Sequence, residues 1–471
     1  MTALRDATAA PAAPASWPFT PIEELDHYLE NAHEPSLVQL ETHAPCHLDR
    51  AALEAALVSV LAADPAARRH LATTSRWGRR LHWHAAAPAT PAGRHPDPDE
   101  EAGLLTVAGW SHPDHLAALR ERLSGWPMPL HGTAVRVILA VGPEHDVVIV
   151  QTHHAAFDGI SSLALLTAIC AAYQERAAAR PGIRRETAPP PVADPGQPGK
   201  PDRSLGGQAS AAPSGSSRRA SPRLPGAVTR IAAHAAEPDR PGYGFVLRSA
   251  AVPRPPRQGS GPYPTVNDLL VAALILTVDR WNAAHGRRSG QIRIAVPVND
   301  REPRRRWEGP GNQSRLIRVT TRPRQRTDPA SLLGRVAAQT RAGKRQPHPG
   351  LDAMSRLLAA GWAPTVIKRH TVRLVRRLAR PVCTDTSLLS NLGILPDPPC
   401  FTGRGLQPLW FSGPAPMPRG LSVGAVTVAD RLHLCVHYRP ALLDSGAAEA
   451  FTAAYGQALA ELAGLPQRRP P

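Results

Sequence analysis

The chain has 471 residues, enough for two hydrophobic cores of ordinary size, so we expect two subdomains. Its formal charge of +17 would suit a polyanion, yet of its 55 basic residues only Lys200, Lys344 and Lys368 are lysines. GC-rich coding produces such an arginine excess without selection for a polyanion. Because no zinc-finger spacing, RNP-like aromatic pattern or basic repeat accompanies the charge, no nucleic-acid partner is expected.

The cysteines and apolar runs bear on location. The five cysteines include no CxxC pair and are not an even-numbered set that could form a disulfide framework, which fits a reducing cytoplasm. They are Cys46, Cys170, Cys383, Cys400 and Cys435. The first residues lack the charged-then-apolar pattern of a secretory signal, and the longest apolar run, Leu269 to Val278, is too short to cross a bilayer. We therefore expect a cytoplasmic protein with no membrane span.

The first part of the chain predicts alternating helices and strands after a short tail. Residues 1–18 are rich in Ala and Pro and are predicted to be disordered. A helix with Leu53, Leu57, Val60 and Leu61 on one face follows a first helix and strand. The other elements expected before the centre of the chain are a helix near 22–30, strands near 37–43, 80–84 and 104–107, and a helix near 114–123.

The most informative stretch runs from Val147 to Ile169, VVIVQTHHAAFDGISSLALLTAI. A β-branched run ends in His153 and His154, and a short loop leads through Asp158 to a segment with helical character. Since side chains alternate across a strand, the two histidines should point in opposite directions, so that only one faces a given cavity.

The corner after the histidines is predicted to be rigid. Gly159 suits a sharp turn or a close approach of another group, and Ser161 or Ser162 can cap the helix that follows. Two other interpretations of the histidines stay open. They could be strand-end residues with satisfied ring nitrogens, or metal ligands, although neighbouring strand residues diverge and no third ligand cluster is close in sequence.

The composition changes abruptly after this helix, which is predicted to end near Arg180. Residues 181–225 are rich in Pro, Gly, Ser and Arg without apolar periodicity, so they read as a linker between subdomains at 19–180 and 226–471. Phosphate binding by the linker arginines is the alternative to a solvated tether.

The second half predicts a further sheet with helices. Thr265 and Asp268 form a capping-box-like start to a buried helix. The other expected elements are strands near 244–250, 291–301 and 313–320, helices near 329–344 and 364–380, a hairpin turning at 429–430 and a helix from 444.

The HHxxxDG pattern at 153–159 resembles the signature of the chloramphenicol acetyltransferase-like superfamily. That superfamily includes peptide-synthetase condensation domains, polyketide-associated acyltransferases and wax ester synthases. The resemblance implies that His154, Asp158 and His153 are the catalytic residues, with His154 as the base and Asp158 as its structural organiser. It also implies that Arg301, at the end of QIRIAVPVNDR, pairs with Asp158, although Arg304, Arg305 and Arg306 compete for this role.

Two other segments resemble the polyketide-associated and wax ester synthase branch. Gly311 and Asn312 match its Gly-Asn signature, and are expected to shape the backbone beside a substrate tunnel or simply to form a turn. Ser390, Asn391 and Gly393 match its Ser-Asn-Leu-Gly segment, which suggests a tunnel wall and a domain contact.

The resemblance implies an α/β fold with two chloramphenicol acetyltransferase-like subdomains that form a V with a tunnel at their junction. The implied function is a stand-alone condensation-type acyltransferase of specialised-metabolite biosynthesis, which moves an acyl group from a thioester to a hydroxyl or amine. We expect no bound cofactor or metal. The phosphopantetheine arm would come with an acidic acyl or peptidyl carrier protein or with coenzyme A, the acceptor would be a small molecule, and a monomer is favoured. The alternatives are a catalytically silent docking protein and a wax ester or diacylglycerol synthase-like enzyme.

Overall fold

A computed structural model describes most of the chain. The described ranges are 16–31, 33–72, 77–85, 104–178, 227–238, 240–256, 263–301, 311–345, 353–378, 384–403 and 406–464. The predicted linker at 181–225 lies outside them, as do tail residues 1–15 and the three competing arginines at 304–306.

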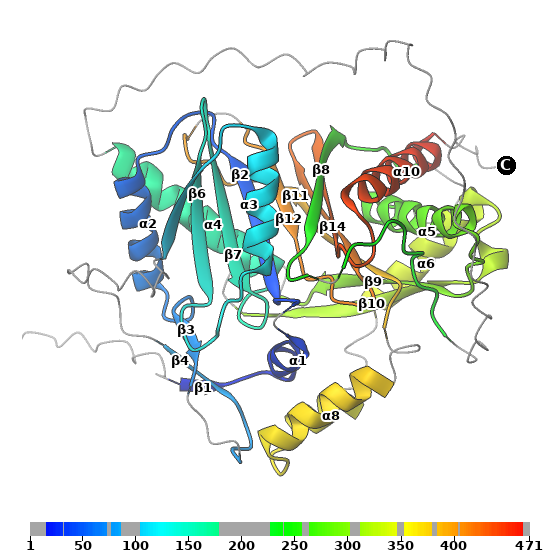
Figure 1. Cartoon of the computed structure of the whole chain (residues 1–471), viewed down its shortest axis with the longest axis horizontal. Coiled ribbons are helices and arrows are strands. Elements are labelled where there is room, and N and C mark those ends of the chain that lie inside the picture. Colours follow the sequence, from blue (N-terminus) through cyan, green and yellow to red (C-terminus); the bar gives the residue numbers. More distant parts are fainter. Residues whose placement is uncertain are drawn as a thin grey trace, which may run out of the picture.

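The first large sheet belongs to the N-terminal half (Figure 1). Its strand order is β12-β2-β7-β6-β5, and only the β5–β6 pair is parallel. The bounds are β2 Leu37–His43, β5 Leu105–Gly109, β6 Val135–Val141, β7 Asp146–His153 and β12 Leu409–Ser412. Residues of β7 alternate between the two faces, so Val148 and Val150 pack with α2 and α4 while Val147 and Ile149 pack with α3. The helices are α2 Arg50–Ala63, α3 Pro113–Gly125 and α4 Gly159–Ala178.

The second large sheet has six strands in the order β10-β9-β11-β13-β14-β8. Its strands are β8 Gly244–Ala251, β9 Ile292–Asn299, β10 Ser314–Thr321, β11 Ser387–Leu395, β13 Leu421–Val428 and β14 Arg431–Tyr438. Helices α5 Val266–Ala284, α6 Pro329–Arg345 and α10 Ser445–Ala463 share a hydrophobic core with it. The predicted capping box is present, because Thr265 and Asp268 exchange side-chain and backbone hydrogen bonds at the start of α5.

A third sheet corrects the prediction for the tail. Its order is β1-β4-β3, with β1 Ser16–Pro18, β3 Arg69–Leu71 and β4 His82–Ala85. The disorder predicted to residue 18 is wrong for 16–18, because Trp17 lies opposite Trp83 in the β1–β4 pair. The reason is tertiary: the partner strand is more than sixty residues away and gives no local signal.

Helix α1 (Pro21–Leu29) lies below the two large sheets in Figure 1, with α8 (Thr365–Leu378) next to it. It contacts α7 (Ala353–Ala359) as well as α8. A short 3-10 turn at Pro323–Gln325 precedes α6. None of the helices in the described ranges combines the length and apolar character needed to cross a bilayer.

Strand pairing and a backbone bridge are among the contacts that join the two halves of the chain. Strand β12 comes from the C-terminal half but pairs with β2, so the first sheet includes a strand from beyond the predicted boundary. Phe157 forms a parallel bridge with Gly311. The Phe157–Gly311 bridge lies at the corner that follows β7, and Phe411 of β12 lies against Gly159 at the start of α4. These contacts place the HHxxxDG motif where the halves meet.

Candidate active site

Strand β7 ends at His153, and α4 begins six residues later at Gly159. Asp158 is the residue that caps this helix, because its Oδ1 accepts a hydrogen bond from the Ser161 amide at 2.8 Å. Ser161 reciprocates, since its Oγ accepts from the Asp158 amide at 2.8 Å. The prediction that Ser161 or Ser162 is itself the cap is therefore wrong. The aspartate occupies the position because its carboxylate accepts from the helix and from a second partner at once.

That second partner is Arg301. Its Nη1 donates to Oδ2 of Asp158 at 2.7 Å and its Nη2 donates to Oδ1 at 3.2 Å, with both side chains almost fully buried. The Gln313 amide also donates to Oδ2, at 2.9 Å. The predicted pairing of Arg301 with Asp158 is thus present. Because donors surround the carboxylate, Asp158 is suited to hold the corner in place and has no lone pair directed at a substrate.

His153 is fully buried and both of its ring nitrogens are engaged. Its Nδ1 accepts from the Ala155 amide at 3.1 Å, so the proton resides on Nε2, which donates to Glu30 at 2.9 Å. Burial alone would raise the pKa of Glu30, but the hydrogen bonds from His153 and from the Ser36 amide help to lower that pKa below its usual value. His153 is therefore a structural link between β7 and the end of α1.

His154 has the complementary arrangement. Its Nδ1 lies 3.1 Å from the Phe157 carbonyl oxygen, which can only accept, so Nδ1 carries the proton. The remaining nitrogen, Nε2, then holds a lone pair, and no described residue forms a hydrogen bond with it. The side chain is half-buried, and the His154 amide is fixed by a 2.7 Å bond to the Ser36 carbonyl. Of the two histidines, only His154 has a ring nitrogen without a hydrogen-bond partner among the described residues.

Asp26 of α1 lies beside His154 and was not predicted. Asn312 links the two, since its Nδ2 donates to Oδ2 of Asp26 at 2.8 Å and contacts the His154 carbonyl at 3.3 Å. Burial raises the pKa of Asp26, and the hydrogen bond from Asn312 opposes that rise. In the sequence this carboxylate reads as the solvated side of an amphipathic helix, and only the docking of α1 places it at the site.

Gly311 is held directly against the motif corner. Its carbonyl accepts from Ser161 Oγ at 3.2 Å and from Arg301 Nη2 at 2.9 Å. Its φ of +109° is a conformation that side-chain-bearing residues rarely adopt, which explains the glycine. Of the two predictions for Gly311 and Asn312, the structure thus favours a role in shaping the site over a simple turn.

Gly159 permits a close approach. A Cβ atom built there would lie 2.8 Å from the Phe411 ring of β12 and 3.0 Å from Leu392 of β11. The Ser-Asn-Leu-Gly segment therefore meets α4 through Leu392. The other predicted residues of this segment lie within β11. Asn391 Oδ1 accepts a hydrogen bond from the Gly393 amide at 2.9 Å, where the strand is irregular, and Ser390 is half-buried opposite Gly424.

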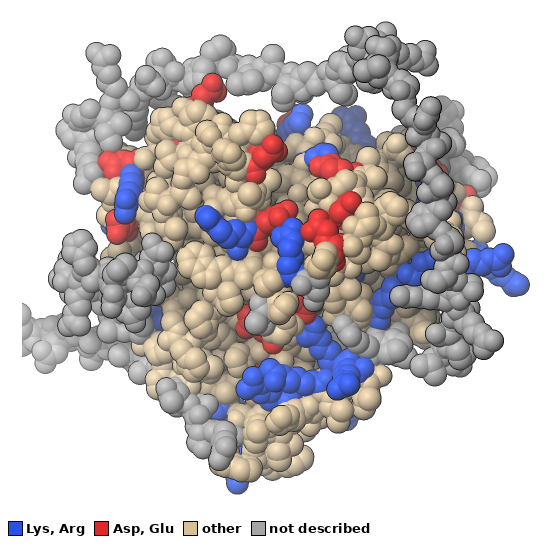
Figure 2. Space-filling model, viewed as in Figure 1, with Lys and Arg blue, Asp and Glu red and all other residues tan. Residues whose placement is uncertain are grey.

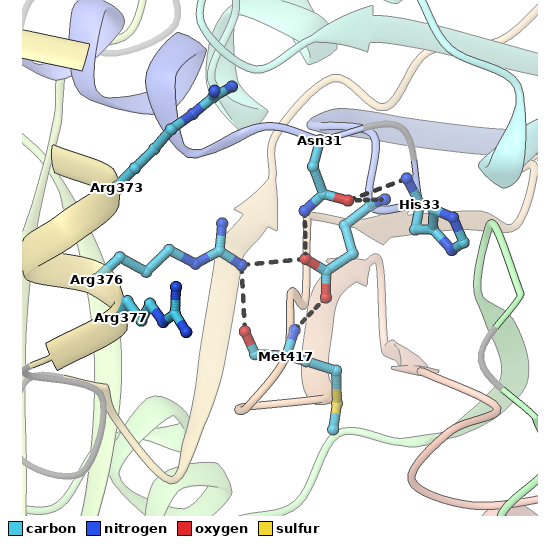
Figure 3. A pocket seen from close by; sticks show the side chains of 7 residues that line it. Asn31, His33, Arg373, Arg376, Arg377 and Met417 are labelled. Carbon is cyan, nitrogen blue, oxygen red and sulfur yellow. Dashed lines mark hydrogen bonds and ion pairs between the residues drawn. The ribbon is translucent and has the colours of Figure 1, made fainter. Parts of the chain in front are cut away.

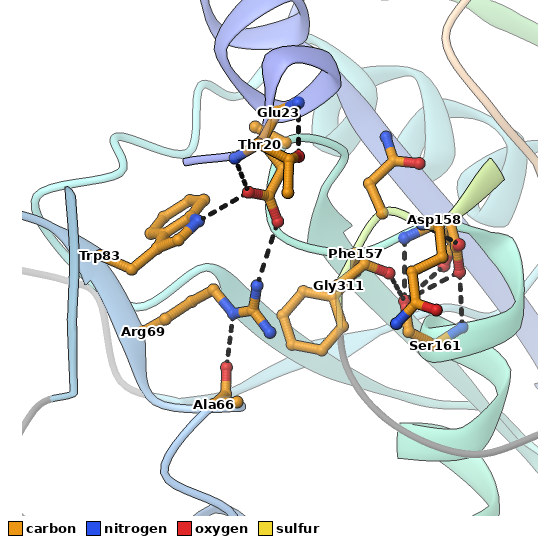
Figure 4. Close-up of polar contacts among 12 residues, drawn as sticks. Thr20, Glu23, Ala66, Arg69, Trp83, Phe157, Asp158, Ser161 and Gly311 are labelled. Atoms are coloured by element: carbon orange, nitrogen blue, oxygen red, sulfur yellow. Dashed lines mark hydrogen bonds and ion pairs between the residues drawn. The ribbon is translucent and has the colours of Figure 1, made fainter. Parts of the chain in front are cut away.

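Arg69 supports the corner from the other side (Figure 4). Its guanidinium lies over the Phe157 ring at 5.7 Å and over the Trp83 ring at 5.5 Å, and its Nη1 lies 3.4 Å from Glu23 Oε1. Glu23 also accepts from the Trp83 indole at 3.2 Å. Because the Phe157 carbonyl accepts the hydrogen bond from His154 Nδ1, Arg69 indirectly helps to hold the His154 ring. No sequence pattern identified it.

Metal ligation is the remaining interpretation of the histidines. Among the residues that the structure describes, no group of three or more His, Cys, Asp or Glu side chains is placed to hold a metal ion. In the described corner, the polar atoms of His153 and Asp158 are directed at Glu30 and Arg301 instead.

Comparison with known proteins identifies the fold. No protein-family model matches the chain. An uncharacterised protein of Mycobacterium tuberculosis, found in two strains, is 28% identical over 401 residues, which cover 81% of this chain and 84% of that protein.

Three solved structures are similar over nearly their whole length. The first condensation domain of the CDA synthetase has 18% identity and a TM-score of 0.59, covering 97% of this chain and 98% of that one. A mutant starter condensation domain of rhizomide synthetase, in complex with C8-CoA and Leu-SNAC, has 13% identity and a TM-score of 0.60, covering 96% of each chain. The epimerization domain from the third module of tyrocidine synthetase B has 14% identity and a TM-score of 0.53, covering 95% and 96%. The chain has the α/β condensation-domain fold, as the HHxxxDG resemblance predicted.

Proposed function

We propose that this protein is an acyltransferase that uses His154 as its general base. The acceptor hydroxyl or amine gives its proton to Nε2 of His154 as its oxygen or nitrogen forms a bond to the thioester carbonyl carbon. When the tetrahedral intermediate collapses, the carbon–sulfur bond breaks and the imidazolium returns the proton to the departing thiolate. The observation that carries the proposal is the contact between His154 Nδ1 and the Phe157 carbonyl, which leaves Nε2 unprotonated.

The other motif residues hold this base in place. Asp158 and Arg301 join the start of α4 to the C-terminal half, and His153 joins β7 to α1 through Glu30. Such positioning groups support catalysis by keeping the base and two substrates aligned. They touch neither substrate in this mechanism.

The substrates follow from the condensation-type chemistry. The donor is an acyl thioester on a phosphopantetheine arm, carried by an acyl or peptidyl carrier protein or by coenzyme A, and the acceptor is a small molecule. The complex of the rhizomide synthetase domain with C8-CoA and Leu-SNAC supports a thioester donor. We further propose a stand-alone, monomeric enzyme of specialised-metabolite biosynthesis in the cytoplasm, with its substrates meeting at His154 in a tunnel between the two halves.

The test is direct assay of the purified protein. Octanoyl-CoA and octanoyl-N-acetylcysteamine are each incubated with a panel of small amines and alcohols, thiol release is followed optically, and products are identified by mass spectrometry. Thiol release that depends on an acceptor, with a matching ester or amide, supports the proposal. Failure with every donor, including acyl-carrier proteins, together with tight carrier binding would instead support the docking-protein alternative. A strong preference for long-chain donors and acceptors would favour the wax ester or diacylglycerol synthase alternative.

A further inference from the structure

A basic pocket lies where α8 meets the segment that joins α1 to β2. Its volume is about 440 Å³, and it is open to solvent (Figure 3). Arg373, Arg376 and Arg377 of α8 face Glu34 across it, which leaves two formal positive charges in excess. The other lining residues are Asn31, His33 and Met417. Basic side chains also gather over α8 on the surface of the molecule (Figure 2).

One arginine and the single carboxylate of this pocket neutralise each other. Arg376 donates to Glu34 Oε2 at 3.0 Å and to the Met417 carbonyl at 3.2 Å. Glu34 also accepts from Asn31 Nδ2 at 2.7 Å and from the Met417 amide at 2.5 Å. Because Glu34 is buried and its oxygens are occupied in this way, it does not serve the other two arginines.

Arg373 and Arg377 stand four residues apart on the exposed side of α8. Neither has a hydrogen bond or an ion pair with any residue that the structure describes. In Figure 3 the two lie on either side of Arg376: Arg377 is next to it, whereas the Arg373 side chain points away from the Arg376–Glu34 pair. Burial lowers the pKa of the Arg373 guanidinium, and the charge of Arg369 one turn earlier lowers it further. Like charges at this spacing on a helix repel one another, so an anion between the helix and the side chains of Asn31, His33 and Glu34 would stabilise the arrangement.

The pocket is connected to the active site through the same short segment. Glu30, directly before Asn31, bonds to His153, and the Ser36 carbonyl bonds to the amide of His154. Asn31, His33 and Glu34, which line the pocket on this side, therefore lie between two contacts with the histidine pair in the sequence.

We propose that Arg373 and Arg377 bind the phosphoryl group at the end of a phosphopantetheine arm. Guanidinium groups offer paired N–H donors that match phosphate oxygens, and those of Arg373 and Arg377 have no acceptor among the described residues. The assignment rests on the proposed function, because it supplies the donor substrate of that reaction. The same phosphoryl chemistry comes from a carrier protein or from coenzyme A.

The test compares donors that differ only in that phosphate. Octanoyl-4′-phosphopantetheine and octanoyl-pantetheine are assayed with the parent and with the double variant Arg373→Ala/Arg377→Ala. For the phosphorylated donor, KM should rise by about tenfold or more in the double variant with little change in kcat, as expected for two lost charged hydrogen bonds. The KM for octanoyl-pantetheine should not change. Arg369→Ala, which removes one charge from the same helix outside the pocket, is the matched control and should leave both values near those of the parent.

Further arms identify the source and separate the two proposals. If the double variant raises the KM equally for acyl-carrier protein and acyl-coenzyme A, the phosphate of the arm is supported as the common ligand. If the KM rises with acyl-coenzyme A alone, the pocket binds the nucleotide phosphates and the proposed site is overturned. Calorimetric titration with 4′-phosphopantetheine needs no turnover. Binding by the parent that the double variant loses, without any acyl transfer, keeps the site and refutes the acyltransferase. If the parent and the double variant both transfer the acyl group, and in each the KM is the same for the donors with and without phosphate, the phosphate site is refuted and the acyltransferase proposal stands.

Discussion

The pairing of Asp158 with Arg301 makes a quantitative prediction about stability. In Asp158→Asn, one carboxylate oxygen becomes an NH₂ donor. If it replaces Oδ2, it faces Nη1 of Arg301 and the Gln313 amide, which lie 2.7 and 2.9 Å away. If the amide is flipped, the NH₂ faces the Ser161 amide and Nη2 of Arg301. Either orientation sets donor against donor and leaves a buried guanidinium without a counter-charge.

Breaking a buried ion pair from one side costs about 3 to 5 kcal/mol of unfolding free energy. We expect Asp158→Asn and Arg301→Met each to lose an amount in this range, and the double variant to lose much less than the sum. The coupling free energy should be about 3 kcal/mol, measured by urea unfolding of the four proteins. A matched exposed pair, Arg280 with Glu461, has side chains 53% and 40% exposed and should couple by less than about 1 kcal/mol. Additive effects of Asp158→Asn and Arg301→Met would refute the reasoning.

Three further predictions concern stability. Gly159→Ala should cost about 1 to 3 kcal/mol of unfolding free energy, because its Cβ would lie 2.8 Å from the Phe411 ring; an unchanged urea midpoint would contradict this contact. Gly311→Ala should cost about 1 to 3 kcal/mol because of its φ of +109°, whereas Gly334→Ala, in the open middle of α6, should gain about 0.5 to 1 kcal/mol; equal midpoint shifts would refute the conformational explanation. Burial lowers the pKa of His437 to about 3, so the unfolded chain binds a proton first as the pH falls below about 6.5, and the folded state loses up to about 1.4 kcal/mol per pH unit between these values. Urea titrations at about pH 7 and pH 5 should show that His437→Gln loses less unfolding free energy between these pH values than the parent does. An equal loss in both proteins would exclude His437 as the cause of the pH dependence.

Local patterns predicted the regular elements well. The strand expected near 37–43 is β2 with those bounds, and the predicted capping box starts α5, because apolar periodicity and capping chemistry act within one element. Strand β12 has only four residues and pairs with a strand more than three hundred positions earlier. No local signal specifies such a partner, and the same holds for β1.

The site residues also divide into those that a local sequence pattern identified and those that only the tertiary packing brings to the site. The histidines, Asp158 and Arg301 stand in a pattern dense enough to identify, and the contact of Arg301 with Asp158 is present. Asp26 and Glu30 were not found, because on a single amphipathic helix a carboxylate that meets a histidine looks the same as one that meets water. Only the packing of α1 against β7 distinguishes them.

The central claim is that the free Nε2 of His154 acts as the base of acyl transfer. The most direct test is the single-turnover rate of His154→Ala and of the parent with octanoyl-N-acetylcysteamine, a donor without phosphate that bypasses the arginine pocket, and the best acceptor found. Because a general base contributes about 100-fold to 10,000-fold, the rate should fall by that factor while the melting temperature stays close to that of the parent. A folded His154→Ala protein that keeps most of the parental rate would contradict the account.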